Sequence, residues 1–93
     1  MEKLIVLYTM EGCPYCTEMK ELLTKENITY ISRDVDEYSD EYDMFMEAID
    51  GNDFLPAFMV IEQTDKDYNV SFFAPERDYE MVSEAVEIIK NLV

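Results

Sequence analysis

The pattern of hydrophobic positions predicts a strand, a helix and a second strand in the first third of the chain. Apolar residues run almost without interruption from Lys3 to Thr9, which is typical of a strand buried on both faces. Gly12 allows a turn, and apolar residues then recur at helical spacing from Pro14 to about Asn27, with proline where a helix tolerates it best. The segment from Ile28 to Asp34 alternates and predicts a second strand, parallel to the first because a helix connects them.

The rest of the chain predicts another helix, a hairpin and a last helix. Ser39 is a suitable N-cap for the second helix. The segments Ala57–Glu62 and Tyr68–Phe73 are strand-like, and the five polar residues between them suit an antiparallel hairpin. A third helix is expected from about Pro75 or Asp78 onward, with an apolar stripe of Val82, Ala85, Val86, Ile89 and Leu92. The predicted order is βαβ, α, ββα.

Length and composition favour one small globular domain over residues 1–93. The 93 residues are 48% hydrophobic, which is too many for a disordered chain. The longest early apolar run, Leu4 to Leu7, is too short for a membrane span or a signal-peptide core, so we expect a soluble, cytoplasmic protein. We also expect a monomer. The net charge of -15, from 22 acidic and 7 basic residues, would repel nucleic acid and anionic membranes, and we expect neither as a partner.

The motif Cys13-Pro14-Tyr15-Cys16 contains both cysteines of the chain and lies at the predicted start of the first helix. The N–H groups and dipole of a helix N-terminus favour a thiolate, and Cys13 occupies the N-cap position. A thiol one helical turn later, at Cys16, can attack a mixed disulfide formed by the first. A structural disulfide that closes so short a loop would stabilise little. The motif therefore predicts thiol–disulfide chemistry.

A metal centre is the alternative from another functional class. Cys13 and Cys16 could supply half of a zinc site, or Cys13 could be one ligand of an iron–sulfur cluster shared between two subunits. The sequence has no histidine and no second cysteine pair, so one chain alone could not complete a tetrahedral site of sulfur and nitrogen. We therefore name no metal ligands in the preferred interpretation, and keep as the alternative an iron–sulfur or zinc-binding module that uses Cys13 and Cys16.

The element order, the Cys-Pro-Tyr-Cys motif at a helix start and Leu55-Pro56 before the third strand together resemble the glutaredoxin family. The resemblance implies a thioredoxin fold of the α/β class, with a four-stranded mixed sheet flanked by three helices. It further implies an enzyme, a thiol–disulfide oxidoreductase, with Cys13 as the nucleophile and Cys16 as the resolving thiol. Protein disulfides would be the substrates, and glutathione mixed disulfides are a second substrate class.

The same resemblance implies a binding site for glutathione as co-substrate, with no tightly bound cofactor. Tyr15 would flank the bound tripeptide, and Pro56 would be the family's cis proline. The backbone of Leu55 would then pair with an extended thiol substrate as an added strand does. Without the cysteine motif, Leu55-Pro56 would be interpreted as an ordinary turn into a strand.

Several positions depart from the usual glutaredoxin pattern. Met10 stands where many members of the family have lysine, and the acidic stretch 36–41 stands where they often have a residue that grips a carboxylate. The usual Gly-Gly and aspartate after the last strand are replaced by 72–78, in which Asp78 alone could serve. Phe54 replaces a usual threonine and could form an apolar rim for a protein substrate. Cations for glutathione are therefore scarce.

A second branch of the family shares some of these features. The chain is similar to the glutaredoxin-like hydrogen donors of ribonucleotide reductase at Leu55-Pro56 and at Ser71–Pro75. That resemblance implies ribonucleotide reductase as the partner that accepts electrons and thioredoxin reductase, in place of glutathione, as their source. The residues between the cysteines, Pro14-Tyr15, are unusual for this branch, so both alternatives stay open.

Overall fold

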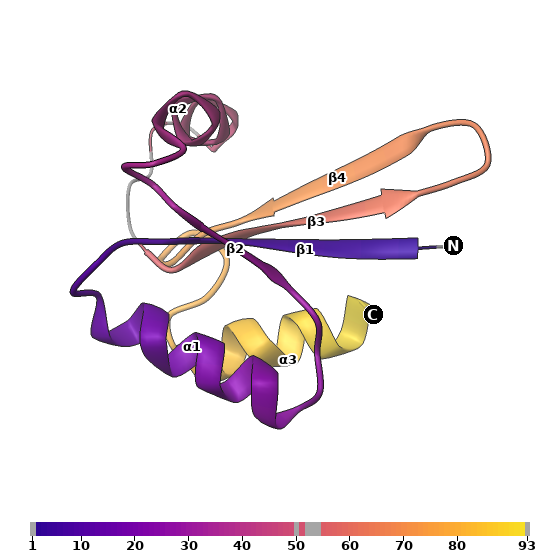
Figure 1. Cartoon of the computed structure of the whole chain (residues 1–93). Coiled ribbons are helices and arrows are strands. Elements are labelled where there is room, and N and C mark those ends of the chain that lie inside the picture. The colour runs from indigo at the N-terminus through magenta and orange to yellow at the C-terminus, as the bar shows by residue number, and fades with distance from the viewer. Residues whose placement is uncertain (1, 50, 52–54, 93) are drawn as a thin grey trace.

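The computed structural model describes residues 2–49, 51 and 55–92, and Phe54 lies outside them. Within this part of the chain the strands and helices follow the predicted order: β1 (Glu2–Thr9), α1 (Pro14–Lys25), β2 (Ile31–Asp34), α2 (Ser39–Ala48), β3 (Ala57–Gln63), β4 (Tyr68–Phe73) and α3 (Val82–Leu92). The sheet order is β2-β1-β3-β4. Strand β2 is parallel to β1, while β3 is antiparallel to both β1 and β4. The α/β fold with a mixed sheet is thus confirmed (Figure 1).

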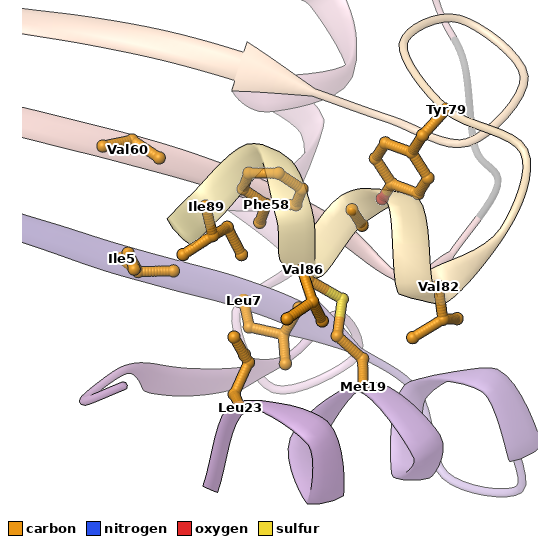
Figure 2. Packing of buried hydrophobic residues seen from close by; sticks show 11 residues of the cluster. Ile5, Leu7, Met19, Leu23, Phe58, Val60, Tyr79, Val82, Val86 and Ile89 are labelled. Atoms are coloured by element: carbon orange, nitrogen blue, oxygen red, sulfur yellow. The ribbon is translucent and has the colours of Figure 1, made fainter. Parts of the chain in front are cut away.

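The larger core lies between the sheet and the pair of helices α1 and α3, which together cover one face (Figure 1). Ile5 and Leu7 of β1 point to this face, where side chains from both helices meet them (Figure 2). The buried members of this core are Ile5, Leu7, Met19, Leu23, Phe58, Val60, Tyr79, Val82, Ala85, Val86 and Ile89. The apolar stripe predicted for the third helix is therefore the surface that α3 buries against α1 and the sheet.

On the opposite face of the sheet, α2 is the one helix of the described residues (Figure 1). Val6 and Tyr8, which alternate with the residues above, pack here against Phe45 of α2, and the Tyr8 and Phe45 rings are 4.8 Å apart at their centroids. Both faces of β1 are thus buried, which accounts for its unbroken apolar sequence. Next to this core, the cross-strand row of Leu4, Ile61 and Val70 is only partly covered, and Leu4 and Val70 are 39% and 42% exposed.

The predicted start of the third helix was wrong. Helix α3 begins at Val82 rather than at Pro75 or Asp78, because the residues before it form a tight loop. In this loop Glu76 has a left-handed backbone conformation (φ 65°), and the Asp78 carboxylate accepts a hydrogen bond from the Ala74 N–H. A carboxylate that binds a backbone N–H four residues earlier competes with helix formation at that point.

Three other predicted boundaries shift by a few residues. Strand β2 begins at Ile31 instead of Ile28, because Asn27 has φ 59° and the Ile28 N–H bonds back to the Leu23 carbonyl, which closes the end of α1. The predicted helix over 14–27 accordingly ends at Lys25. Helix α2 has Tyr38, not Ser39, at its N-cap, and no side chain caps it.

Candidate redox site

The two cysteines lie at the start of α1, as the pattern of residues around them predicted. Strand β1 ends at Thr9, and Gly12 takes a left-handed conformation (φ 80°) that turns the chain into the helix. Cys13 is the N-cap of α1, and its Sγ accepts a hydrogen bond of 3.1 Å from the N–H of Cys16. One of the N–H groups at the helix start, which have no partner within the helix, is therefore directed at the sulfur of Cys13.

Cys13 and Cys16 form a disulfide, with their Cα atoms 5.3 Å apart. The two sulfur-bearing residues differ in exposure. Cys16 is only 2% exposed, because it faces the interior from the first turn of α1, whereas Cys13 is half-buried at the protein surface. Of the two cysteines, Cys13 is thus the one that another molecule can approach.

The segment Leu55-Pro56 lies at the same end of the sheet as the cysteine motif. Its peptide bond is cis, in agreement with the glutaredoxin resemblance. Ala57, the next residue, pairs with Tyr8 near the end of β1, so the start of β3 and the turn before Cys13 are neighbours. Pro56 is buried, and its carbonyl accepts a hydrogen bond from the hydroxyl of Tyr79.

A pocket of about 420 Å³ opens beside these elements. Its wall is formed by α1, the cis-proline segment, the loop between β4 and α3, and the first residues of α3. The lining residues are Tyr15, Glu18, Leu55, Pro56, Pro75, Glu76, Tyr79, Glu80, Met81, Val82 and Ser83. The fold therefore brings together three of the residues that the sequence predicted for substrate binding, namely Tyr15, Leu55 and Pro56.

Asp78, the fourth predicted binding residue, does not line this pocket. Its carboxylate oxygen Oδ2 lies 2.7 Å from a guanidinium nitrogen of Arg77 and 2.9 Å from the backbone nitrogen of Ala74. Both interactions stay within the loop between β4 and α3. The observed role of Asp78 is therefore to hold this loop in shape.

The sequence pattern did not indicate the contribution of this loop to the pocket, in particular Glu76, Glu80 and Met81. A topological signal was available. In a hairpin, the end of β4 lies beside the start of β3, and Phe73 indeed pairs with Phe58. Because the start of β3 follows the cis proline, any loop after β4 had to begin at the cysteine end of the sheet.

Burial alters the acidity of Tyr79, the residue that joins the loop to the cis proline. Loss of hydration raises the pKa of its hydroxyl well above the ordinary value, and the nearby charge of Asp78 raises this pKa further. The hydroxyl is therefore protonated at any physiological pH and remains a hydrogen-bond donor to Pro56.

Neither a metal-ligand cluster nor a membrane-spanning helix is found among the described residues. Among residues 2–49, 51 and 55–92, no group of three or more His, Cys, Asp or Glu side chains has the arrangement of a metal site. Over the same residues, none of the helices is both long enough and apolar enough to cross a bilayer.

Comparison with known proteins identifies relatives in sequence and in fold. The Glutaredoxin family model matches residues 5–60. Glutaredoxin 1 of Rickettsia typhi is 32% identical over 57 residues, which are 60% of this chain and 55% of the relative. Glutaredoxin 1 of Rickettsia prowazekii is also 32% identical over 57 residues, or 60% of each chain. The chain thus spans little more than half the length of these relatives.

A solved structure resembles the whole fold. Thioredoxin of Trichomonas vaginalis superposes with a TM-score of 0.62 over 98% of this chain and 79% of its own, at 18% sequence identity. At this level of identity the likeness establishes the thioredoxin fold alone.

Proposed function

Because the chain belongs to the glutaredoxin family, we propose that it is a thiol–disulfide oxidoreductase whose redox pair is Cys13 and Cys16. One observation carries the proposal. An accessible cysteine caps a helix and is bonded to a second, buried cysteine one turn later. This arrangement provides a nucleophile that partners can reach and a resolving thiol that they cannot.

In the first step of the proposed reaction, the Cys13 thiolate attacks one sulfur of a substrate disulfide. A mixed disulfide forms, and the second substrate sulfur leaves as a thiolate and takes up a proton. The N–H of Cys16 is directed at the Cys13 sulfur, and with the dipole of α1 it favours the charged nucleophile. The exposed N–H and C=O of an extended substrate would pair with the backbone of Leu55.

In the second step, the Cys16 thiol loses its proton and attacks the Cys13 sulfur of the mixed disulfide. The substrate leaves with both sulfurs reduced, and the Cys13–Cys16 disulfide of the structure remains. Two electrons have then passed from the protein to the substrate; one proton comes from the Cys16 thiol and the other from solvent, because Cys13 reacts as the thiolate. A separate reductant must restore the dithiol, and no tightly bound cofactor is needed.

Glutathione is our first candidate for that reductant, with glutathione mixed disulfides as a further substrate. Its support is that Tyr15, Leu55 and Pro56 line one pocket. Thioredoxin reductase is the second candidate, with electron donation to ribonucleotide reductase. Its support is that the described residues lining the pocket include carboxylates and neither lysine nor arginine, so a glutathione carboxylate would find no cation among them.

The activity and its reductant can be tested in one set of assays. Reduction of insulin disulfides is followed with NADPH consumption, once with glutathione and glutathione reductase and once with thioredoxin reductase. We expect Cys13→Ser to lose activity by a factor of about 1,000 or more in both, since it removes the nucleophile. Serine is itself a good N-cap, so the helix is kept and circular dichroism should match the wild type.

The role of Cys16 is tested by a second substrate. Cys16→Ser should lose insulin reduction yet still remove glutathione from a glutathionylated peptide, because that reaction needs Cys13 and external glutathione only. Activity retained in Cys13→Ser would overturn the proposed function. Turnover with thioredoxin reductase alone would replace glutathione as the reductant and leave the oxidoreductase proposal intact.

A further inference from the structure

Three carboxylates surround the pocket beside the redox motif. Glu18 comes from α1, and Glu76 and Glu80 come from the loop between β4 and α3. All three residues are exposed. Among the described residues that line the pocket there is no lysine or arginine, so nothing in the wall offsets the three negative charges.

Some carboxylates elsewhere in the described part of the chain have cationic partners. Glu41 lies 2.8 Å from Arg33, and Lys90 lies 3.5 Å from both Glu26 and Glu87. The cation nearest to the pocket in sequence, Arg77, turns away to Asp78 and to a backbone carbonyl. Within the described part of the chain, none of Glu18, Glu76 and Glu80 takes part in an ion pair, so their field acts on whatever enters the pocket.

The pocket also has an apolar component close to these charges. Tyr15 and Met81 are each 64% exposed, and Leu55 and Pro56 complete this part of the wall. Lysine and arginine side chains combine the two properties that such a wall selects, because their aliphatic stems cover apolar surface while the charged group reaches a carboxylate. A volume of about 420 Å³ is at the small end of the range for ligand pockets, which suits one or two side chains of a peptide.

We propose that the preferred substrates of this redox site are protein disulfides whose cysteines are flanked by lysine or arginine. This inference rests on the proposed function and names the substrate class of the same site. In the reaction, the Cys13–Cys16 dithiol reduces the substrate disulfide to two thiols and becomes the disulfide. The flanking cations bind at Glu18, Glu76 and Glu80 and place the substrate sulfur at Cys13.

The expected size of the preference follows from surface electrostatics. A charged cleft can raise the rate of association with an oppositely charged partner by tenfold or more at low salt. Because the Debye length falls from about 10 Å at 0.1 M salt to about 3 Å at 1 M, the preference should be lost at high salt. We expect a difference of about tenfold in rate at 0.02 M NaCl and less than about twofold at 1 M.

The test uses short peptides that contain one intramolecular disulfide and differ only beside the cysteines. One peptide has two lysines there, the second has two glutamines and the third has two glutamates. The protein is first reduced with dithiothreitol and desalted, so that a single turnover needs no reductase. The peptide thiols formed are separated and quantified after an acid quench, which gives a second-order rate constant for each peptide.

Two matched variants separate local from overall charge. The first, Glu18→Gln/Glu76→Gln/Glu80→Gln, removes the three carboxylates of the pocket. The control, Asp43→Asn/Glu47→Gln/Asp65→Asn, changes the net charge equally at exposed residues of α2 and the hairpin loop, outside the pocket. We expect the ratio of lysine to glutamine rates to fall toward one in the first variant and to stay near its wild-type value in the control.

The outcomes distinguish this inference from the proposed function. If the wild type reduces all three peptides at equal rates, the preference for cations is wrong while the oxidoreductase activity stands. If both variants lose the preference equally, net charge causes it and the pocket carboxylates do not, which also overturns the inference. If no peptide is reduced and Cys13→Ser behaves like the wild type, the proposed function itself fails.

Discussion

The two faces of the sheet are built from alternate residues of the same strands, yet they differ in how they are covered. Ile5 and Leu7 meet two helices, while Val6 and Tyr8 meet one. The face with two helices also receives the loop that forms the pocket. The redox motif therefore belongs to the face whose packing is more complete, and a reactive group held to a fixed geometry benefits from that rigidity.

Each face also contains a buried tyrosine whose hydroxyl bonds across elements. On the face with α1 and α3, Tyr79 donates to the backbone carbonyl of Pro56. On the face with α2, Tyr8 donates to a carboxylate oxygen of Glu41 at 3.0 Å, and the other oxygen of Glu41 bonds to Arg33. The acceptor Glu41 thus has a second partner, Arg33, in addition to Tyr8. The acceptor on the other face, the carbonyl of buried Pro56, receives its hydrogen bond from Tyr79.

The largest contrast between the faces should appear in the free energy of unfolding. Leu23→Ala removes a fully buried side chain of α1 and should destabilise the protein by about 3 kcal/mol. Val70→Ala, in the partly covered row on the other face, should cost less than about 0.5 kcal/mol. Urea denaturation followed by circular dichroism measures both. Equal losses would mean that the two faces are packed alike.

A smaller contrast is expected between the two tyrosines. Tyr79→Phe leaves the buried carbonyl of Pro56 without its donor and should cost about 2 kcal/mol. Tyr8→Phe should cost about 1 kcal/mol, because Glu41 keeps Arg33 and is partly exposed to water. The same denaturation measurement applies. A larger loss for Tyr8→Phe would show that the face with α2 depends more on its buried hydroxyl.

An effect of similar size is expected at alkaline pH. The pKa of Tyr79 is raised in the folded protein, so the folded state retains the proton more tightly than the unfolded state does. Its contribution to stability is complete below the unfolded pKa of about 10 and is lost as pH rises toward the folded value. Between pH 10 and 11 the wild type should lose about 1 kcal/mol more than Tyr79→Phe, measured by urea denaturation at each pH. Parallel pH profiles would contradict this account.

The sequence predicted the fold well where hydrophobic periodicity was strong. The alternation in β1 and the stripe of α3 located the two layers, and the limits of β4 were predicted as observed. The start of α3 was missed because the residues after Pro75 have helical composition, whereas a side-chain bond from Asp78 to the backbone of Ala74 decides their conformation. Whether the helix or this side-chain hydrogen bond forms depends on the three-dimensional positions of the groups, which the pattern of hydrophobic residues does not reveal.

Of the candidate site, only the part formed by neighbouring residues in the sequence was predicted. The cysteine motif is local in sequence, so its position at a helix start followed from the pattern around it. The wall of the pocket instead combines α1 with a loop some sixty residues later. Nothing in the composition of that loop distinguished Glu76 and Glu80, which face the pocket, from Asp78, which does not.

The partly covered face has a consequence for the behaviour of the protein in concentrated solution. Strand β4 is an edge of the sheet. The cross-strand row of Leu4, Ile61 and Val70, which ends on β4, is partly exposed to solvent. An open edge next to apolar side chains can act as a template for aggregation, and at neutral pH the net charge of -15 keeps copies of the chain apart. Near pH 4.1, the isoelectric point of the sequence, this repulsion is lost, and we expect the protein to aggregate most readily through this edge.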